Sequence, residues 1–367
     1  MNKKILTEMK KSAYKPGMLL IAALLLSFTA YGQEELTKEY HKEYKVSPSM
    51  TLDLNNRYGD IDIETSGSDQ VVIDIKVTLK YPNRERAEKL LGYIDVEFNE
   101  EPERISAKTV IDDRFSFTGW SGESRRFSID YTVRMPENMN LALTNRYGNT
   151  ELDDLSGHVS LDIKYGNLTA SKLSRGNEKP LNTISLAYGK GSVEEAGWLD
   201  ALFRYCGSFT IDKSQAILLD SRYSKVQLGT VSSVVGETKY DNLRIDKINN
   251  FVLESGYTDI NIGTLSNKLV FDVAYGSFNV DRVAEGFESI SLESRYTGVR
   301  MAIDESASYK LEGKVSYGGL KFNEDNYRNI KRIVENTSTT VEGIVGKEEA
   351  PTAFVKVDSS YGTIRLN

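Results

Sequence analysis

The chain has 367 residues, a net charge of −7 at pH 7, a single cysteine and two histidines. The acidic balance disfavours a nucleic acid or an anionic lipid surface as a partner bound through net charge. One cysteine excludes an internal disulfide, and two histidines exclude a metal site built from several imidazoles.

Residues 1–32 have the features of a secretory signal peptide. Lysines precede an apolar run over residues 18–30, and Ala30 and Gly32 place small residues at the two positions that signal peptidases recognise. The run is too short for a comfortable membrane span, and no later stretch is apolar enough for one. No cysteine stands directly after the run, so a lipoprotein anchor is not indicated. We expect a mature chain that begins at Gln33, and the loss of five lysines and one glutamate brings its net charge to −11.

Residues 33–140 are predicted to form a β-rich N-terminal cap that includes the first repeat, over residues 51–64. Apolar and polar residues alternate from Gln70 to Tyr81, which predicts a long strand. Pro82-Asn83 then opens a short helix, because apolar residues recur at helical spacing after it. The other strands expected here are an edge strand within residues 34–49 and strands over 94–98, 104–111 and 127–135. A cap of this kind closes one end of a stack of repeats.

Two aromatic residues, Phe117 and Trp120, stand in a glycine- and serine-rich segment between Asp112 and Arg126. One interpretation makes this segment a loop that contacts a ligand, with Phe117 and Trp120 as the binding residues. The other makes it the tip of a hairpin whose aromatic side chains fold back onto the sheet. The pattern is compatible with both, so Phe117 and Trp120 are the ligand-binding prediction of the sequence.

Twelve tyrosines mark a repeat that extends from residue 52 to the C-terminus. Alternating apolar and polar residues lead into each tyrosine, Gly, Ser or Thr usually follows it, and a second alternation leads out. The spacing is 17–18 residues in the middle of the chain and lengthens to 21, as in a stacked array. Cys206 follows one of these tyrosines, and we interpret it as a tolerated small residue rather than a reactive thiol. The tyrosines are Tyr58, Tyr147, Tyr165, Tyr188, Tyr205, Tyr223, Tyr240, Tyr257, Tyr275, Tyr296, Tyr317 and Tyr361.

The alternation inside each repeat predicts two short strands, each with one buried face. The apolar positions shift by one residue across the tyrosine, as a corner requires if apolar groups are still to point inward. Stacked copies bury the inner face and pair each backbone with the next at about 4.8 Å. We therefore predict an all-β fold, a parallel β-solenoid or β-helix-like stack of Tyr-Gly repeats of roughly 17–21 residues. The tyrosines would form a ladder along one edge, which is either a structural element or a surface for sugars.

Charged residues hold two fixed positions before the tyrosines, and both positions fall on the outer face. Acidic residues three positions before are Asp162, Asp220, Glu237, Glu254, Asp272, Glu293 and Asp358. Basic residues one position before are Arg57, Arg146, Lys164, Arg204, Arg222, Lys239 and Arg295. An acidic column beside a basic column predicts ion pairs between neighbouring repeats, each of which contributes little alone.

The end of the chain is expected to leave the stack and then return to it. We assign a helix to residues 325–336, because Tyr327, Ile330 and Val334 share one helical face. A polar loop follows, and the chain ends on a strand of the repeat. The predicted boundaries are residues 1–32 for the signal peptide, 33–140 for the cap, 141–324 for the repeats, 325–352 for the helix and loop excursion, and 353–367 for the last repeat strand.

No constellation of catalytic residues is recognisable in the sequence. His41 and His158 are not accompanied by a Gly-x-Ser-x-Gly elbow, and P-loop and dinucleotide-binding motifs are absent. Asp60, Asp62 and Glu64 alternate on one strand face, which could hold Ca²⁺ or form a solvated row balanced by Lys and Arg. We therefore predict no catalytic residue, no metal ligand and no cofactor.

Three copies of the repeat have closely similar sequences: Asn56-Arg-Tyr-Gly-Asp-Ile-Asp-Ile63, Asn145-Arg-Tyr-Gly-Asn-Thr-Glu-Leu152 and Ser360-Tyr-Gly-Thr-Ile-Arg-Leu366. Together with the signal peptide, they resemble the putative adhesin family of exported β-repeat cell-envelope proteins that is common in Bacteroidota. The resemblance covers roughly residues 40–367. It implies an exported, non-enzymatic β-solenoid in the periplasm or on the outer surface of a Gram-negative bacterium. It supplies no catalytic residues.

We accordingly expect a non-catalytic cell-envelope or surface protein that binds or scaffolds in the manner of an adhesin. Its partner would be a cell-surface glycan or an envelope protein. One alternative is a polysaccharide-active β-helix enzyme, which would gather carboxylates with Arg or Lys in a groove. Another is a periplasmic partner of a signalling system. The charges follow the repeat instead of converging on one place, which favours the first function.

Overall fold

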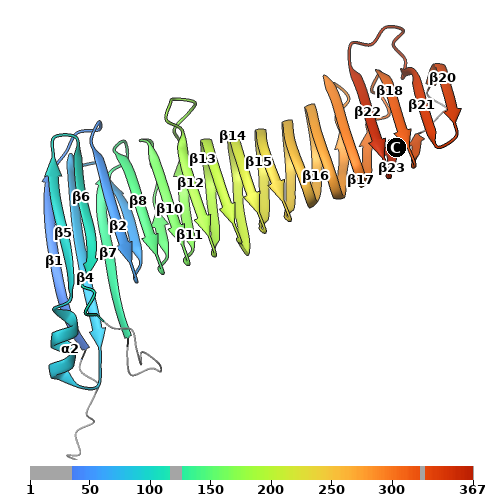
Figure 1. The fold of residues 1–367 in the computed structure, drawn as a ribbon. Helices are drawn as coiled ribbons and strands as arrows, with labels where there is room; N and C mark the ends of the chain where they lie inside the picture. The colour runs from blue at the N-terminus through green and yellow to red at the C-terminus, as the bar shows by residue number, and fades with distance from the viewer. Residues whose placement is uncertain (1–34, 116–125, 323–326, 367) are drawn as a thin grey trace, which may run out of the picture.

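The computed structural model describes residues 35–115, 126–322 and 327–366, which form an all-β structure with a long, mostly parallel sheet (Figure 1). The first strands are β1 (Glu35–Lys45), β2 (Thr51–Arg57), β3 (Ile61–Ser66), β4 (Gln70–Lys80), β5 (Ile94–Glu101), β6 (Arg104–Ile111) and β7 (Arg126–Pro136). Next come β8 (Asn140–Arg146), β9 (Thr150–Leu152), β10 (Val159–Lys164), β11 (Leu168–Leu173), β12 (Asn182–Ala187), β13 (Lys190–Arg204), β14 (Ser208–Arg222), β15 (Lys225–Lys239), β16 (Asn242–Val283) and β17 (Ser289–Ile303). The last are β18 (Tyr309–Ser316), β19 (Gly319–Phe322), β20 (Tyr327–Glu335), β21 (Ser338–Val345), β22 (Phe354–Ser360) and β23 (Thr363–Leu366).

The strands form two rows that meet at the tyrosines. Strands that lead into a tyrosine make the first row, in which β2, β8, β10 and β12 pair in parallel. Strands that lead out of a tyrosine make the second row, in which β3, β9 and β11 pair in parallel. From β13 to β17 a single strand spans both rows; the first half of β13, for example, pairs with β11 and its second half with β12. We call the stretch from one tyrosine to the next a rung.

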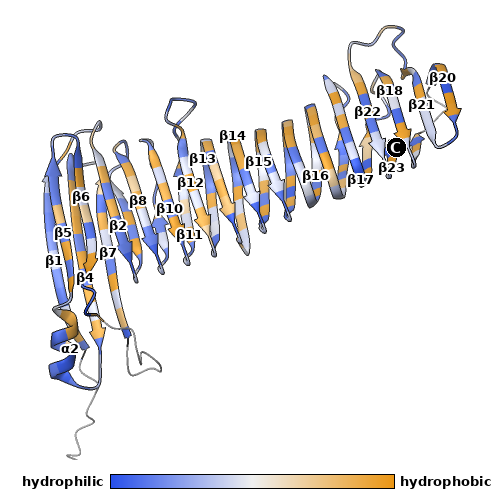
Figure 2. Cartoon of the chain, in the orientation of Figure 1, coloured by the Kyte–Doolittle hydropathy of each residue, from blue (hydrophilic) through white to orange (hydrophobic). Residues whose placement is uncertain are grey.

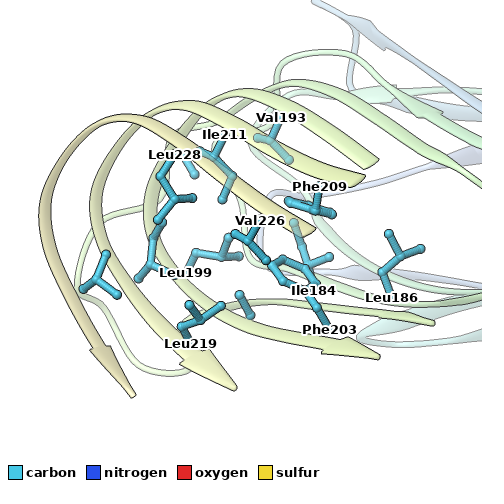
Figure 3. Packing of buried hydrophobic residues seen from close by; sticks show 14 of the residues in the cluster. Ile184, Leu186, Val193, Leu199, Phe203, Phe209, Ile211, Leu219, Val226 and Leu228 are labelled. Carbon is cyan, nitrogen blue, oxygen red and sulfur yellow. The ribbon is translucent and has the colours of Figure 1, made fainter. Parts of the chain in front are cut away.

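The apolar interior lies between the two rows. Neighbouring rungs are in register, so that Phe209 lies opposite Val226 and Leu228 lies opposite Ile245. Figure 3 shows Phe209, Val226 and Leu228 pointing into the space enclosed by the bent strands, and Phe203 and Phe209 are fully buried there. Apolar and polar residues alternate along the strands of Figure 2. Each buried Val, Leu or Phe contributes about 1.5–3 kcal/mol, so the interior stabilises the rungs jointly.

The N-terminal end of the stack consists of antiparallel strand pairs. β1 pairs with β4 and β4 pairs with β7, after which β7 joins β3 in parallel. In the first row β5 pairs antiparallel with β6, which joins β2 in parallel. Helix α2 (Arg84–Leu91) begins after Asn83, whose side chain accepts a hydrogen bond of 2.8 Å from the Arg86 amide. The strands and the helix expected from sequence in this region are confirmed.

The C-terminal strands do not follow sequence order in space. β22 pairs in parallel with β17 on one side and with β18 on the other. β23 likewise lies between β17 and β19. The end of the chain therefore fills a place between two rungs that precede it in sequence.

The helix predicted over residues 325–336 is wrong, because β20 occupies the described part of this segment. β20 pairs antiparallel with β21, and the register shifts between Arg328 and Lys331, where Asn329 has a φ of 52°. This bulge breaks the period of two, so the apolar residues fall at a spacing that imitates a helix. A lone helix of this length is marginal in water, whereas pairing with β21 satisfies the backbone.

Candidate functional site

The tyrosine at each corner has a left-handed backbone. All twelve repeat tyrosines have φ between 53° and 66°, a region that non-glycine residues seldom adopt. The tyrosine amide donates a hydrogen bond to a carbonyl of the adjacent rung, as from Tyr147 to Lys164 (3.0 Å) and from Tyr205 to Arg222 (3.0 Å). The conformation turns the chain sharply and directs the ring outward along the corner.

The twelve rings form one stacked series, which we call the tyrosine column. Successive rings lie 4.7–5.1 Å apart between centroids, and their planes differ by 1–12°. Tyr361 lies between Tyr296 and Tyr317, as the strand order requires. At the other end, Tyr58 packs on Phe127 at 5.2 Å. Stacking adds about 0.5–1.5 kcal/mol per ring pair and offsets the cost of the left-handed backbone.

The tyrosine column presents ring edges and hydroxyl groups to solvent. From Tyr147 to Tyr361 its residues are about half exposed, with 41% at Tyr275 and 59% at Tyr317, whereas Tyr58 is less exposed. Inside the column each ring face is covered by the next ring, so a sugar cannot stack on it. A ligand of the column would instead contact a row of phenol edges at the rung spacing.

Beneath the first part of the column the rungs approach very closely at glycine. Gly148, Gly166 and Gly189 follow their tyrosines, and a Cβ added to any of them would lie 1.8–1.9 Å from a carbonyl oxygen of the adjacent rung. Backbone amides of these turns donate hydrogen bonds to asparagine side chains of the adjacent rung, and each asparagine stands one position after a glycine. Asn149 Oδ1 accepts from the Asn167 amide at 3.1 Å, and Asn167 Oδ1 accepts from the Lys190 amide at 3.0 Å.

Further along, polar side chains replace the glycines at the same position. Cys206, Ser224, Asp241 and Thr258 follow successive tyrosines and are buried. Each of the first three donates its amide to the side chain of the next: 3.0 Å to Ser224 Oγ, 2.6 Å to Asp241 Oδ1 and 3.2 Å to Thr258 Oγ1. We call this series the corner ladder. The period of the repeat located these residues, but the sequence did not indicate that they bond to each other.

Cys206 belongs to the corner ladder and is 2% exposed, with Sγ 3.3 Å from the Leu186 carbonyl oxygen. Burial raises the pKa of the Cys206 thiol, which lowers its thiolate fraction at neutral pH. We expect the native protein to resist alkylation by iodoacetamide at pH 7.5, and the unfolded protein to react fully in the same time. Mass spectrometry of both samples measures this, and fast labelling of the native protein would contradict the burial.

Asp241 is the carboxylic acid of the corner ladder, and burial raises its pKa to about 6. An unfolded aspartate titrates near 3.9, so the folded state binds more protons between these values and stability falls as pH rises through this window. Asp241→Asn keeps an oxygen for the Ser224 amide and removes the buried charge. We expect this variant to melt at a higher temperature than the native chain at pH 7.5, with the difference disappearing near pH 4. An equal difference at both pH values would contradict the assignment.

The outer columns of charge form the ion pairs expected between rungs. Arg146 pairs with Asp162, and Arg204 with Asp220 at 2.6 Å. Further pairs join Arg222 to Glu237 at 2.7 Å and Arg295 to Asp272 at 2.9 Å. The arginines also bond to backbone, as Arg204 Nη1 does to the Asp220 carbonyl oxygen at 3.0 Å. These charges hold neighbouring rungs together and follow the repeat.

The acidic row at the first corner is also in register with the rungs. Asp62 lies opposite Glu151 on the next strand, and burial raises the Asp62 pKa, with Glu64, Glu151 and Asp153 adding to the effect. Asp60 Oδ1 accepts a hydrogen bond of 2.6 Å from the Asn149 amide. Over the described ranges, no group of three or more His, Cys, Asp or Glu side chains has an arrangement that could hold a metal ion.

The two histidines lie in different surroundings. His41, on β1, is exposed and bonds to Asp74 at 2.5 Å and to Glu43 at 3.1 Å. Asp74 and then Glu43 raise the pKa of His41. His158 Nε2 lies 3.0 Å from the Leu181 carbonyl oxygen. These partners are carboxylates and a backbone carbonyl, an arrangement that orients an imidazole without activating a nucleophile.

A hollow of about 370 Å³ lies beside α2, and the sequence did not indicate it. Its lining includes Tyr81, Arg86, Lys89, Tyr93 and Arg114. The Arg86 guanidinium lies 5.5 Å from the Tyr81 ring and that of Arg114 lies 4.8 Å from the Tyr93 ring. Cationic groups over aromatic rings suit a small ligand that carries an anionic group.

Phe117 and Trp120, the predicted ligand-binding residues, lie outside the described residues. Just before them, Arg114 bonds to Asp112 at 2.6 Å and lowers the pKa of that carboxyl to about 2. The two aromatic residues remain a prediction from sequence.

In the described part of the chain, no helix is long and apolar enough to cross a membrane. No family model matches the chain, and no curated protein sequence matches it. Among solved structures, it aligns with a "putative cell adhesion protein" from Clostridium sporogenes at 13% identity and a TM-score of 0.18, covering 90% of this chain and 99% of the other. A "putative adhesin" from Bacteroides fragilis aligns at 16% identity and a TM-score of 0.27, covering 73% and 97%. A "putative lipid binding protein" from Parabacteroides distasonis aligns at 14% identity and a TM-score of 0.23, covering 73% and 92%.

Proposed function

We propose that this chain is an exported, non-catalytic cell-envelope or surface protein, built as a β-solenoid that binds or scaffolds through its long regular faces. The observation that carries the proposal is the tyrosine column with the charged columns beside it. Ion pairs such as that of Arg204 with Asp220 join neighbouring rungs, so these charged groups already have partners within the stack. An enzyme would need charged side chains that lie outside these repeated positions and point into one substrate-binding cleft.

The partner proposed for the column is a cell-surface glycan, with an envelope protein as the second possibility. The phenol groups are about half exposed and recur every 4.7–5.1 Å along the stack. A polymer that bears repeated hydroxyl groups can meet such a row at several places at once. Many weak contacts then add to a useful affinity although each one is small.

A glycan and cell-wall polymer binding screen on the mature chain, residues 33–367, tests the proposal. The informative variant replaces Tyr223, Tyr240 and Tyr257 by Phe, which removes three neighbouring hydroxyl groups and keeps the stacked rings. We expect this variant to melt like the native protein and to lose binding. Tyr44→Phe is the control, because Tyr44 lies outside the column and is not part of the lining of the hollow beside α2.

A further variant, Phe117→Ala with Trp120→Ala, tests the ligand-binding prediction from sequence. Binding that survives this change removes that segment from the site. Absence of binding to every glycan, wall polymer and envelope fraction would overturn the proposed function. Release of soluble sugar from a polysaccharide would overturn it in favour of the enzyme.

A further inference from the structure

The first row of strands has an open edge at each end of the molecule. Across the described ranges, β5 pairs with β6 and with no other strand, and β20 pairs with β21 and with no other strand. On the outer edge of β5, Lys38 Nζ donates to the Ile94 carbonyl oxygen at 3.1 Å and the Val96 amide donates to Asp95 Oδ1 at 2.9 Å. The other backbone N–H and C=O groups of the two outer edges have no strand partner among the described residues. Figure 1 shows β5 and β20 at opposite ends of the stack.

The two edge strands carry opposite charge. β5 contains four acidic residues and no basic residue, whereas β20 contains three basic residues and one acidic residue. On β5, Ile94 and Val96 are buried, so Glu97 and Glu101 point to the outer face. Two β5 edges, or two β20 edges, would repel each other. A β5 edge and a β20 edge would attract each other.

The matching charges on β20 lie on the same outer face. Arg328 and Lys331 are opposite Ile344 and Glu342 of β21, which stand two residues apart and so share a face. The buried residues Val341 and Val345 fix the other face of β21 as the inner one. The bulge in β20 thus places Arg328 and Lys331 side by side on the face where β5 has its glutamates.

The direction of the strands also fits. β5 runs antiparallel to β6, which is parallel to every strand of the first row up to β18. β21 is antiparallel to β18, and β20 is antiparallel to β21, so β20 has the direction of β18. If one copy continues the stack of another, β20 meets β5 in antiparallel orientation, which is a regular mode of pairing.

We propose that copies of this chain associate head to tail, with β20 of one copy pairing with β5 of the next and extending the first row. Backbone pairing and burial of exposed apolar residues of β20, Ile330 and Ile333 (both 40% exposed) and Val334 (64% exposed), supply affinity. Opposite charges already lie beside each edge in its own copy: Lys38, which pairs with Asp95 at 3.1 Å, and Lys108 lie beside β5, and Glu342 lies beside β20. The charges therefore select the correct edge more than they add affinity. A contact between two different surfaces repeats into a linear assembly unless its rotation closes a ring.

Sedimentation velocity of the mature chain over a range of protein concentrations tests this. We expect oligomers that grow with concentration and shrink when salt is added. The variant Arg328→Glu with Lys331→Glu, and separately Glu97→Lys with Glu101→Lys, should each weaken association at least about tenfold, because like charges would then face each other across the paired edges. Circular dichroism melting verifies that both fold.

Charge exchange makes the test specific. A mixture of the two variants again has complementary edges, and so does a single chain that carries all four substitutions, so both should associate. Lys225→Glu with Lys247→Glu, in the middle of the stack, is the matched control and should leave association unchanged. The proposal is overturned if the native chain stays monomeric at every concentration, if the edge variants associate like the native chain, or if the mixture does not recover association. Association of the chain with glycan is measured separately, so failure here leaves the proposed function intact.

Discussion

Replacement of Gly166 by alanine is expected to destabilise the protein by about 3 kcal/mol or more, because the added methyl group has no space. Its Cβ would lie 1.8 Å from the Gly148 carbonyl oxygen on the adjacent rung, a separation that real atoms do not reach. That oxygen belongs to backbone and cannot rotate away. The two rungs must separate, which strains the stacking of Tyr147 on Tyr165 at the same corner.

Gly298→Ala is the matched control for this substitution. Gly298 also follows a repeat tyrosine closely, but a Cβ there has no neighbouring atom within 4 Å. We expect the free energy of unfolding of the Gly298→Ala variant to stay within about 0.5 kcal/mol of the native value. Urea unfolding of the three proteins gives the comparison. If Gly166→Ala were as stable as Gly298→Ala, the close approach of the rungs would be wrong.

Phe251→Ala is the second large expected effect, at about 3–5 kcal/mol. Phe251 is fully buried, and its ring packs on Phe271 at 5.5 Å and on Phe278 at 6.3 Å. Removal of the ring leaves a cavity between rungs that are fixed by their backbone pairing, so collapse around it is limited. Thermal and urea unfolding measure the loss.

Two other substitutions in the same rung provide a comparison for the loss of stability in Phe251→Ala. Tyr257→Ala removes one half-exposed ring from the tyrosine column and should cost about 1–2 kcal/mol through lost stacking on both sides. Glu254→Gln, on the outer face, should change stability by less than about 0.5 kcal/mol. The expected order is Phe251, then Tyr257, then Glu254. A reversed order would show that the inner and outer faces are assigned wrongly.

Much of the strand arrangement could be predicted, because side chains of a strand alternate with a period of two and the tyrosines recur at a nearly fixed spacing. The pairing of Arg204 with Asp220 followed from the same register, since both positions repeat relative to a tyrosine. The left-handed φ of the tyrosines was not predicted. A corner was expected there, but the sequence pattern does not show which residue adopts the unusual backbone conformation.

The prediction failed where pairing between distant segments decides the structure. Nothing local in residues 354–366 indicates that β22 and β23 lie between β17 and the strands β18 and β19. The bulge near Asn329 made a strand look like a helix. The corner ladder from Cys206 to Thr258 was missed because small polar residues are common at turns, and only the register between rungs shows that each bonds to the next.

The central claim is that neighbouring rungs lie directly on one another, at a separation of 17 residues in the middle of the chain, and disulfide trapping tests it most directly. Ser233 Oγ lies 3.2 Å from Asn250 Nδ2, and Asn267 Nδ2 lies 2.8 Å from Asn250 Oδ1, so these three positions follow one another along the stack. In a Cys206→Ser background, cysteines at 233 and 250, or at 250 and 267, should oxidise to a disulfide. Cysteines at 233 and 267 are two rungs apart, about 9–10 Å, which is too far for a disulfide. Peptide mass spectrometry should therefore find the first two crosslinks and not the third, and the opposite pattern would contradict the stack.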